Sequence, residues 1–142
     1  MGGLRKVPQS DAVNDLLTLA GFGLAEAAGE PRAHLRFAAA HLAALRGAAA
    51  MVAARSPASS RGRVRSVWEL LAAAAPEFAE WAAFFQAGAS KRSAAQAGVP
   101  VVSAREADDL YRDAVSFVNL VRSAVDVPLV LPVAERALAA TG

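Results

Sequence analysis

Residues 35–52, LRFAAAHLAALRGAAAMV, decide the fold of this chain. One line of side chains recurs at alternating spacings of three and four residues, the pattern of an α-helix that buries one stripe. Its members are Leu35, Ala38, Leu42, Leu45, Ala49 and Val52. A second line has the same spacing on a neighbouring face and consists of Phe37, His41, Ala44, Ala48 and Met51. Because two neighbouring faces need partners, we expect this helix to lie at the centre of a bundle. Its remaining face carries arginines among alanines and Gly47, and such small side chains would let another helix approach closely.

Length and composition favour one helical domain. With 142 residues, the chain is long enough for one hydrophobic core and too short for two well-formed ones. Alanine raises the hydrophobic fraction to 55% and the mean hydropathy to +0.31, but it favours helix and adds little apolar area to a core. The longest weakly polar run, residues 37–54, contains His41 and Arg46, whereas a membrane span needs about 20 strongly apolar residues. We therefore expect no membrane span. A cytoplasmic location is also expected, because residues 1–10 lack the apolar core of a signal peptide.

The chain has no cysteine and only two histidines. The lack of cysteine excludes a disulfide, a thiolate nucleophile and a cysteine metal site. Two histidines argue against a zinc site made from protein side chains alone. No phosphate-binding glycine loop or hydrolase motif occurs, so we expect no metal and no cofactor. The net charge of +2 does not by itself indicate a nucleic-acid-binding protein.

Helix start and stop signals divide the chain into a leader, a helical domain and a tail. Ser66 with Glu69, and Ser103 with Glu106, match the capping box that opens a helix, while Pro76 ends one helix and begins the next. Five helices are predicted, at residues 11–29, 31–55, 66–75, 76–98 and 103–125, and Gly88 is a point where the fourth can be interrupted. The sequence thus predicts an all-α, five-helix up-and-down bundle at residues 10–126. A flexible leader is expected at 1–9, a mobile basic loop at 56–65 and a tail at 127–142.

Three stretches carry a resemblance to a known family. They are AAAHLAALRGAAA (residues 38–50), VWELLAAAAPEFAEWAAFF (67–85) and SAREADDLYRDA (103–114). Together they resemble a small stand-alone bacterial family of HEPN domains, the "higher eukaryotes and prokaryotes nucleotide-binding" superfamily, over about residues 35–125. The resemblance implies an up-and-down helical bundle that is frequently paired as a homodimer. It also places the chain in a superfamily that includes ribonuclease toxins, RNA-processing factors and members without known catalysis.

One short pattern connects the resemblance to catalysis. Ribonuclease members carry an arginine, four to six further residues and then a histidine, and Arg36 to His41 satisfies this pattern. It implies metal-independent RNA cleavage, with His41 as general base or acid near the ribose 2′-OH and Arg36 stabilising charge on the phosphate. Residues five apart on one helix diverge by about 140° around the axis, so two subunits would have to supply the groups jointly. His41 also lies on the line of Phe37, Ala44 and Met51, which favours a histidine in the core or at a dimer interface.

A second hypothesis concerns positive charge around the serine-rich segment 56–65. The arginines involved are Arg55, Arg61, Arg63 and Arg65. A basic segment can follow a phosphate backbone through charge alone, which makes these residues the predicted nucleic-acid-binding site. No aromatic residue alternates with the arginines, so base stacking is not expected there. The alternative, favoured by composition alone, is a solvated linker that is merely rich in arginine.

The remaining charged and aromatic clusters have structural explanations. At helical spacings, Arg105 is expected to pair with Asp108 or Asp109, and Asp108 with Arg112; Asp113 belongs to the same acidic group. The large aromatic side chains are expected to be anchors of the core or of a dimer, and not a platform for stacking bases. They are Trp68, Trp81, Phe84 and Phe85.

Three functions remain open from the sequence. The favoured one is a HEPN-like helical module without demonstrable catalysis that binds nucleic acid or a protein partner. The second is a metal-independent RNA endonuclease of toxin or defence type that uses Arg36 and His41. The third is a structural dimeric adaptor that docks a partner through the apolar tail at residues 127–133. A homodimer is expected in each case, with RNA or a protein as partner and no membrane.

Overall fold

The computed structural model describes residues 11–55 and 66–126, and every regular element in these residues is helical. The elements are α1 (Asp11–Gly29), α2 (Ala33–Arg55), α3 (Val67–Ala74), the 3₁₀ turn η1 (Pro76–Phe78), α4 (Ala79–Ala87), α5 (Ala89–Gln96) and α6 (Ala104–Val125). The all-α fold class is confirmed. The leader at 1–9, the loop at 56–65 and the tail at 127–142 lie outside the described residues.

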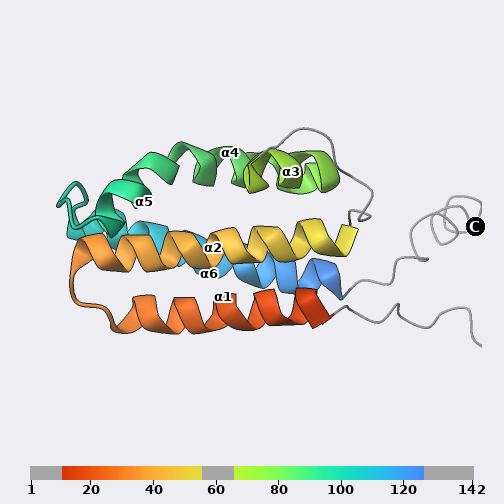
Figure 1. Cartoon of the computed structure of the whole chain (residues 1–142), viewed down its shortest axis with the longest axis horizontal. Helices are drawn as coiled ribbons and strands as arrows, with labels where there is room; N and C mark the ends of the chain where they lie inside the picture. The colour runs from red at the N-terminus through yellow and green to blue at the C-terminus, as the bar shows by residue number, and fades with distance from the viewer. Residues whose placement is uncertain (1–10, 56–65, 127–142) are drawn as a thin grey trace, which may run out of the picture.

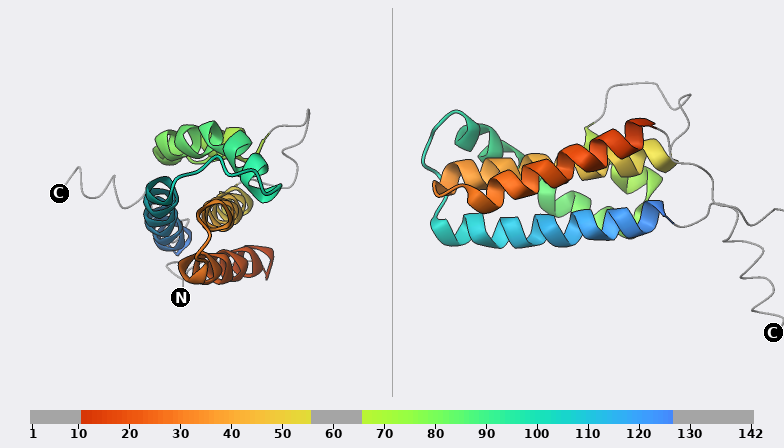
Figure 2. Two further views of the ribbon diagram at one scale, coloured as in Figure 1. Left: turned by 90° about the vertical axis from the view of Figure 1, so that its left-hand side faces the viewer. Right: turned by 90° about the horizontal axis from the view of Figure 1, so that it is seen from below.

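Helix α2 lies at the centre of the bundle, as the two apolar lines on it predict. Figure 1 shows α1 along one side of α2 and the α3–α5 layer along the other. Seen end-on in Figure 2, α6 completes the arrangement beside α1, α2 and the α3–α5 layer. Helix α2 packs against α1, α3, α5 and α6, so neighbours surround it on most sides.

Capping boxes fix where two helices begin. At Ser66 the hydroxyl accepts the Glu69 amide at 3.1 Å, and the Glu69 carboxylate accepts the Ser66 amide at 3.3 Å. At Ser103 the same exchange with Glu106 has both distances at 3.0 Å. Each exchange satisfies two amide groups that have no partner inside the helix. Both starts therefore agree with the sequence prediction.

The single helix expected at residues 76–98 is three shorter pieces. Pro76 opens the 3₁₀ turn, and the chain bends again at Gly88 between α4 and α5. A Cβ at Gly88 would lie 3.6 Å from the His41 ring, an ordinary van der Waals distance, so this bend packs directly against α2. Residue Gly98, with φ of 90°, then ends this layer in the left-handed conformation that glycine adopts without strain. Residues 11–55 and 66–126 therefore form six α-helices, whereas five were predicted.

Of the two apolar lines on α2, the line through Phe37, His41 and Met51 is more deeply buried than the leucine line. Most of the leucine line is only half-buried, whereas the line through Phe37, His41 and Met51 is fully inside. The reason is that Leu35 and Leu42 lie along the α1–α2 edge, where a surface cavity remains beside Arg46. The neighbouring helices instead approach α2 over its small side chains.

Glycine allows two of these close approaches. A Cβ added at Gly23 of α1 would lie 3.1 Å from the Ala43 Cβ on α2. One added at Gly47 of α2 would lie 3.3 Å from Val118 and 3.7 Å from Phe117 on α6. Both distances confirm the expectation that small residues on α2 bring other helices close.

Helix α2 is also the one described helix that is long and apolar enough to cross a membrane. More than half of its apolar window, 56%, is buried inside the bundle. The central helix of a folded core has the same length and composition, so this property is explained by the position of α2.

We predict that Gly47→Leu lowers the free energy of unfolding by about 1–3 kcal/mol, because the new side chain must push α6 away from α2. Urea denaturation followed by circular dichroism measures the change. The control is Gly29→Ala, since a Cβ there meets nothing within 4 Å. Equal stability of Gly47→Leu and the wild type would contradict the close contact between α2 and α6.

Candidate functional site

His41 is the one polar side chain that is fully buried among the described residues. Its ring is stacked near Phe37, with centroids 6.3 Å apart, and meets Trp68 and Phe85 edge-on at 6.0 and 5.8 Å. The Nε2 atom lies 2.8 Å from the Phe85 carbonyl oxygen. This hydrogen bond joins α2 to α4 in the middle of an aromatic core.

The surroundings fix the protonation of His41. A carbonyl oxygen only accepts hydrogen bonds, so Nε2 carries the proton and donates it to Phe85, while Nδ1 has no hydrogen-bond partner among the described residues. Burial lowers the pKa of His41 below its ordinary value, the hydrogen bond to Phe85 raises it by less, and the positive charge of Arg92 lowers it further. His41 is therefore a neutral imidazole whose donor is already used inside the fold.

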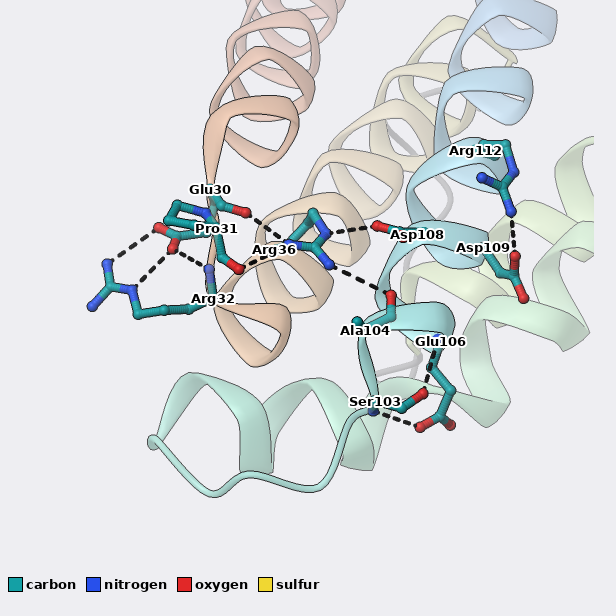
Figure 3. A network of polar contacts seen from close by, with 10 residues as sticks. All are labelled: Glu30, Pro31, Arg32, Arg36, Ser103, Ala104, Glu106, Asp108, Asp109 and Arg112. Carbon is teal, nitrogen blue, oxygen red and sulfur yellow. Dashed lines mark hydrogen bonds and ion pairs between the residues drawn. The ribbon is translucent and has the colours of Figure 1, made fainter.

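Arg36, the first residue of the Arg–His pattern, connects α2 to the α1–α2 turn and to the start of α6. Its Nη1 donates to the carbonyl oxygens of Glu30 and Pro31 at 2.9 and 3.2 Å, which closes the turn between α1 and α2. Its Nη2 donates to Ala104 at 3.4 Å, and its Nε lies 3.0 Å from the carboxylate of Asp108. Figure 3 shows these contacts converging on one guanidinium. Arg36 thus fastens the start of α6 to the α1–α2 turn.

Arg36 and His41, the predicted catalytic pair, therefore contact different parts of one chain. Arg36 reaches the α1–α2 turn and α6, whereas His41 enters the core toward α3 and α4. This separation agrees with the divergence expected for residues five apart on a helix. The structure places His41 in the core position that the sequence analysis favoured.

The predicted nucleic-acid-binding arginines are only partly within the described residues. Arg55, at the end of α2, lies 2.6 Å from the Glu77 carboxylate in η1. This ion pair holds the pKa of Glu77 below its ordinary value. The other three arginines, Arg61, Arg63 and Arg65, lie outside the described residues.

The ion pairs of α6 differ in one respect from the prediction. Arg105 pairs with Asp109 at 3.8 Å, as expected, and Arg112 also pairs with Asp109. The expected pair between Asp108 and Arg112 is wrong, because Arg36 on α2 reaches Asp108 instead. Spacing along one helix could not show a partner supplied by another helix.

Phe84 is the most exposed of the four aromatic residues expected to anchor the core or a dimer. Trp68 and Phe85 are buried and stacked with centroids 5.2 Å apart, but Phe84 remains 46% exposed. It lies between two adjoining cavities of about 420 and 500 Å³, both of which are also lined by Asp113. We name this hollow, between α4–α5 and α6, the α4–α6 groove. It is lined by Phe37, Glu80, Trp81, Phe84, Ala87, Gly88, Lys91, Glu106, Asp109, Leu110 and Asp113.

Acidic side chains dominate the charge of the α4–α6 groove. Its single cation, Lys91, lies 2.7 Å from Glu106 and lowers the pKa of that carboxyl. Asp113 makes no hydrogen bond or ion pair with another described residue, and burial and the nearby charge of Asp109 raise its pKa. No group of three or more potential metal ligands occurs among residues 11–55 and 66–126. Glu106, Asp109 and Asp113 follow helical spacing in the sequence, which is the signal that could have indicated this acidic edge.

We predict that the free energy of unfolding falls as the pH drops below about 6.5, the ordinary pKa of histidine. The reason is that His41 binds a proton in the unfolded chain but stays neutral when it is buried in the folded chain. The slope contributed by His41 approaches about 1.4 kcal/mol per pH unit. Urea titrations of the wild type and His41→Gln between pH 5 and 8 isolate the contribution of His41 to this slope. A glutamine amide can still donate a hydrogen bond to Phe85 but does not titrate. Identical pH slopes in the two proteins would contradict the buried neutral imidazole.

Comparison with known proteins agrees with this architecture. The family model described as SAV_6107-like HEPN matches residues 27–122, from the end of α1 to near the end of α6. No match is found among curated proteins or among solved structures. Because the matched residues make up more than half of the chain, the protein belongs to the SAV_6107-like HEPN family.

Proposed function

We propose that the chain is a HEPN-like module that binds a protein partner and does not cleave RNA with Arg36 and His41. The observation that carries this proposal is the position of His41, whose side chain is fully buried and donates its proton to Phe85. A general base or acid must come within hydrogen-bond distance of the atom it serves. In this position His41 supports the core, and its burial keeps both ring nitrogens out of reach of an RNA substrate.

The charge of the bundle supports a protein as the partner. The described residues contain nine lysines and arginines against twelve aspartates and glutamates, a net charge of −3. Several of the arginines are further engaged with carboxylates of the same chain. Phosphate backbones bind surfaces with an excess of basic side chains. The described residues therefore favour a partner that is not a polyanion.

Nucleic-acid binding remains the second candidate, because positive charge is concentrated in the segments that the structure does not describe. Residues 1–10, 56–65 and 127–142 carry six basic residues and one acidic residue. Three of these, Arg61, Arg63 and Arg65, come directly before α3. If this second function holds, the three arginines bind RNA by attraction to its phosphates, and the bundle positions them.

The same proposal includes three further expectations from the sequence. They are a homodimer, a cytoplasmic location and an adaptor role for the tail at 127–133. The resemblance implies pairing, and the exposed apolar side chains of Leu19 and Phe22 on α1 offer contact area for a partner. Light scattering on the purified chain measures its mass. Co-purification with and without residues 127–142 tests the tail.

We predict that the purified chain leaves structured RNA intact, as does His41→Gln, because the buried imidazole cannot reach a ribose. Gel electrophoresis of labelled RNA after incubation, without added metal, measures cleavage. The decisive contrary result is cleavage by the wild type that is lost in both His41→Gln and Arg36→Lys, while their circular dichroism spectra stay helical.

If the chain binds RNA, we predict that changing Arg61, Arg63 and Arg65 to glutamine weakens binding about tenfold or more and flattens its salt dependence. Fluorescence anisotropy over a series of salt concentrations measures both effects. The control removes the same charge from exposed arginines of the bundle, with Arg32, Arg105 and Arg112 changed to glutamine. An equal loss of RNA affinity in the two triple variants would show that net charge alone matters. It would reject Arg61, Arg63 and Arg65 as the binding site.

A further inference from the structure

We propose that the α4–α6 groove binds an amphipathic helical segment of a partner protein, one that carries arginine or lysine beside aliphatic side chains. This inference rests on the proposed function as a protein-binding module and names the chemistry of the partner. It comes from three properties: the apolar floor of the groove, its acidic edge, and the length that the face of α6 reaches when Leu120, beyond the groove, is included.

The floor of the groove is apolar and open. Phe37 and Leu110 are buried at its base, and Phe84 projects beside them with nearly half of its surface in solvent. Gly88 adds no side chain to fill the space. Exposed aromatic area next to a cavity gains free energy when an aliphatic side chain covers it.

The edge of the groove is acidic along α6. Glu106, Asp109 and Asp113 are separated by three and four residues, so they share one face of the helix. Glu80 on α4 contributes a fourth carboxylate. The sole lysine in the lining, Lys91, is already paired with Glu106. The groove therefore attracts basic side chains and repels phosphate groups.

Asp113 is a specific reason to expect a basic side chain on the partner. It is half-buried, has no ion pair with another described residue, and its pKa is raised by burial and by Asp109. An arginine or lysine placed beside Asp113 would stabilise the charged carboxylate that the unbound groove disfavours. This gain occurs only in the complex, so it adds to affinity.

The length of this surface favours a helix over a small molecule. Leu120 lies seven residues after Asp113, on the same face of α6, and is 48% exposed. From Glu106 to Leu120 the face extends about 21 Å along the helix axis. A partner helix of about 14 residues has this length, and its aliphatic side chains at spacings of three and four can cover Phe84 and Leu120.

A second copy of this chain fits the groove less well than a basic segment. The exposed apolar face on α1 presents Leu19 and Phe22, but Asp15 and Glu26 lie on the same outer side of the helix. Those carboxylates would meet the acidic edge of the groove. Like charges in contact disfavour that pairing.

The test uses a labelled synthetic 14-residue peptide in which leucine recurs every three or four residues and arginine occupies the flanking positions. Fluorescence anisotropy measures its affinity for the full-length chain. We expect Phe84→Ser and Asp113→Asn each to weaken binding about tenfold, because one removes the apolar contact and the other the charge. A peptide with glutamate in place of arginine is expected not to bind. Circular dichroism confirms that the variants remain folded, as expected for side chains outside the core.

The matched control is Phe22→Ser on α1. Phe22 is 68% exposed and has Asp15 and Glu26 nearby on its helix face, but it lines neither cavity of the groove. We expect this variant to bind the peptide as the wild type does. Equal weakening by Phe22→Ser and Phe84→Ser would overturn the proposal, because any exposed aromatic residue would then suffice.

Two other results would also overturn it. If Phe84→Ser converts a dimer to a monomer by light scattering, the groove is the contact between two copies. If labelled RNA binds the wild type and loses affinity in Phe84→Ser, the groove binds nucleic acid. Failure of the groove leaves the proposed function standing as long as the chain leaves RNA uncut, so the two proposals fail separately.

Discussion

Helix α2 can occupy the centre of this bundle only because small side chains let its neighbours come close. Gly47 meets Val118 and Phe117 of α6, and Ala43 meets Gly23 of α1, at distances where an added Cβ would already be crowded. The same constraint determines where larger residues lie. Phe37 and Met51 are buried in the core, while the leucines of α2 remain half-buried. Close packing of this kind has little spare volume, so even small additions at these positions affect stability.

This packing accounts for the Arg–His pattern without catalysis. The rings of Phe37, Trp68 and Phe85 surround His41, and the hydrogen bond to the Phe85 carbonyl offsets the free-energy cost of burying its polar ring. Arg36, one turn earlier, holds together the α1–α2 turn and the start of α6. The surface left open lies elsewhere, where α4 and α5 bend at Gly88 and leave one face of α6 uncovered.

Local signals in the sequence predicted most helix boundaries, because Ser66, Ser103 and Pro76 act through neighbouring backbone atoms. The all-α class followed from the periodicity of the apolar residues. Contacts between distant segments could not be predicted in this way, and the pairing of Arg36 with Asp108 is the clearest case. The α4–α6 groove could not be predicted for the same reason, because its lining residues come from α2, α4, α5 and α6.

The most direct test of this account is the state of the His41 side chain in solution. Nuclear magnetic resonance of the imidazole nitrogens reports which nitrogen carries the proton and whether the ring takes up a second one as the pH falls. We expect a neutral ring with its proton on Nε2, slow exchange of that proton with water, and no titration near pH 6.5. A His41 ring that titrates near pH 6.5 and exchanges its proton rapidly would contradict the buried position on which the whole interpretation depends.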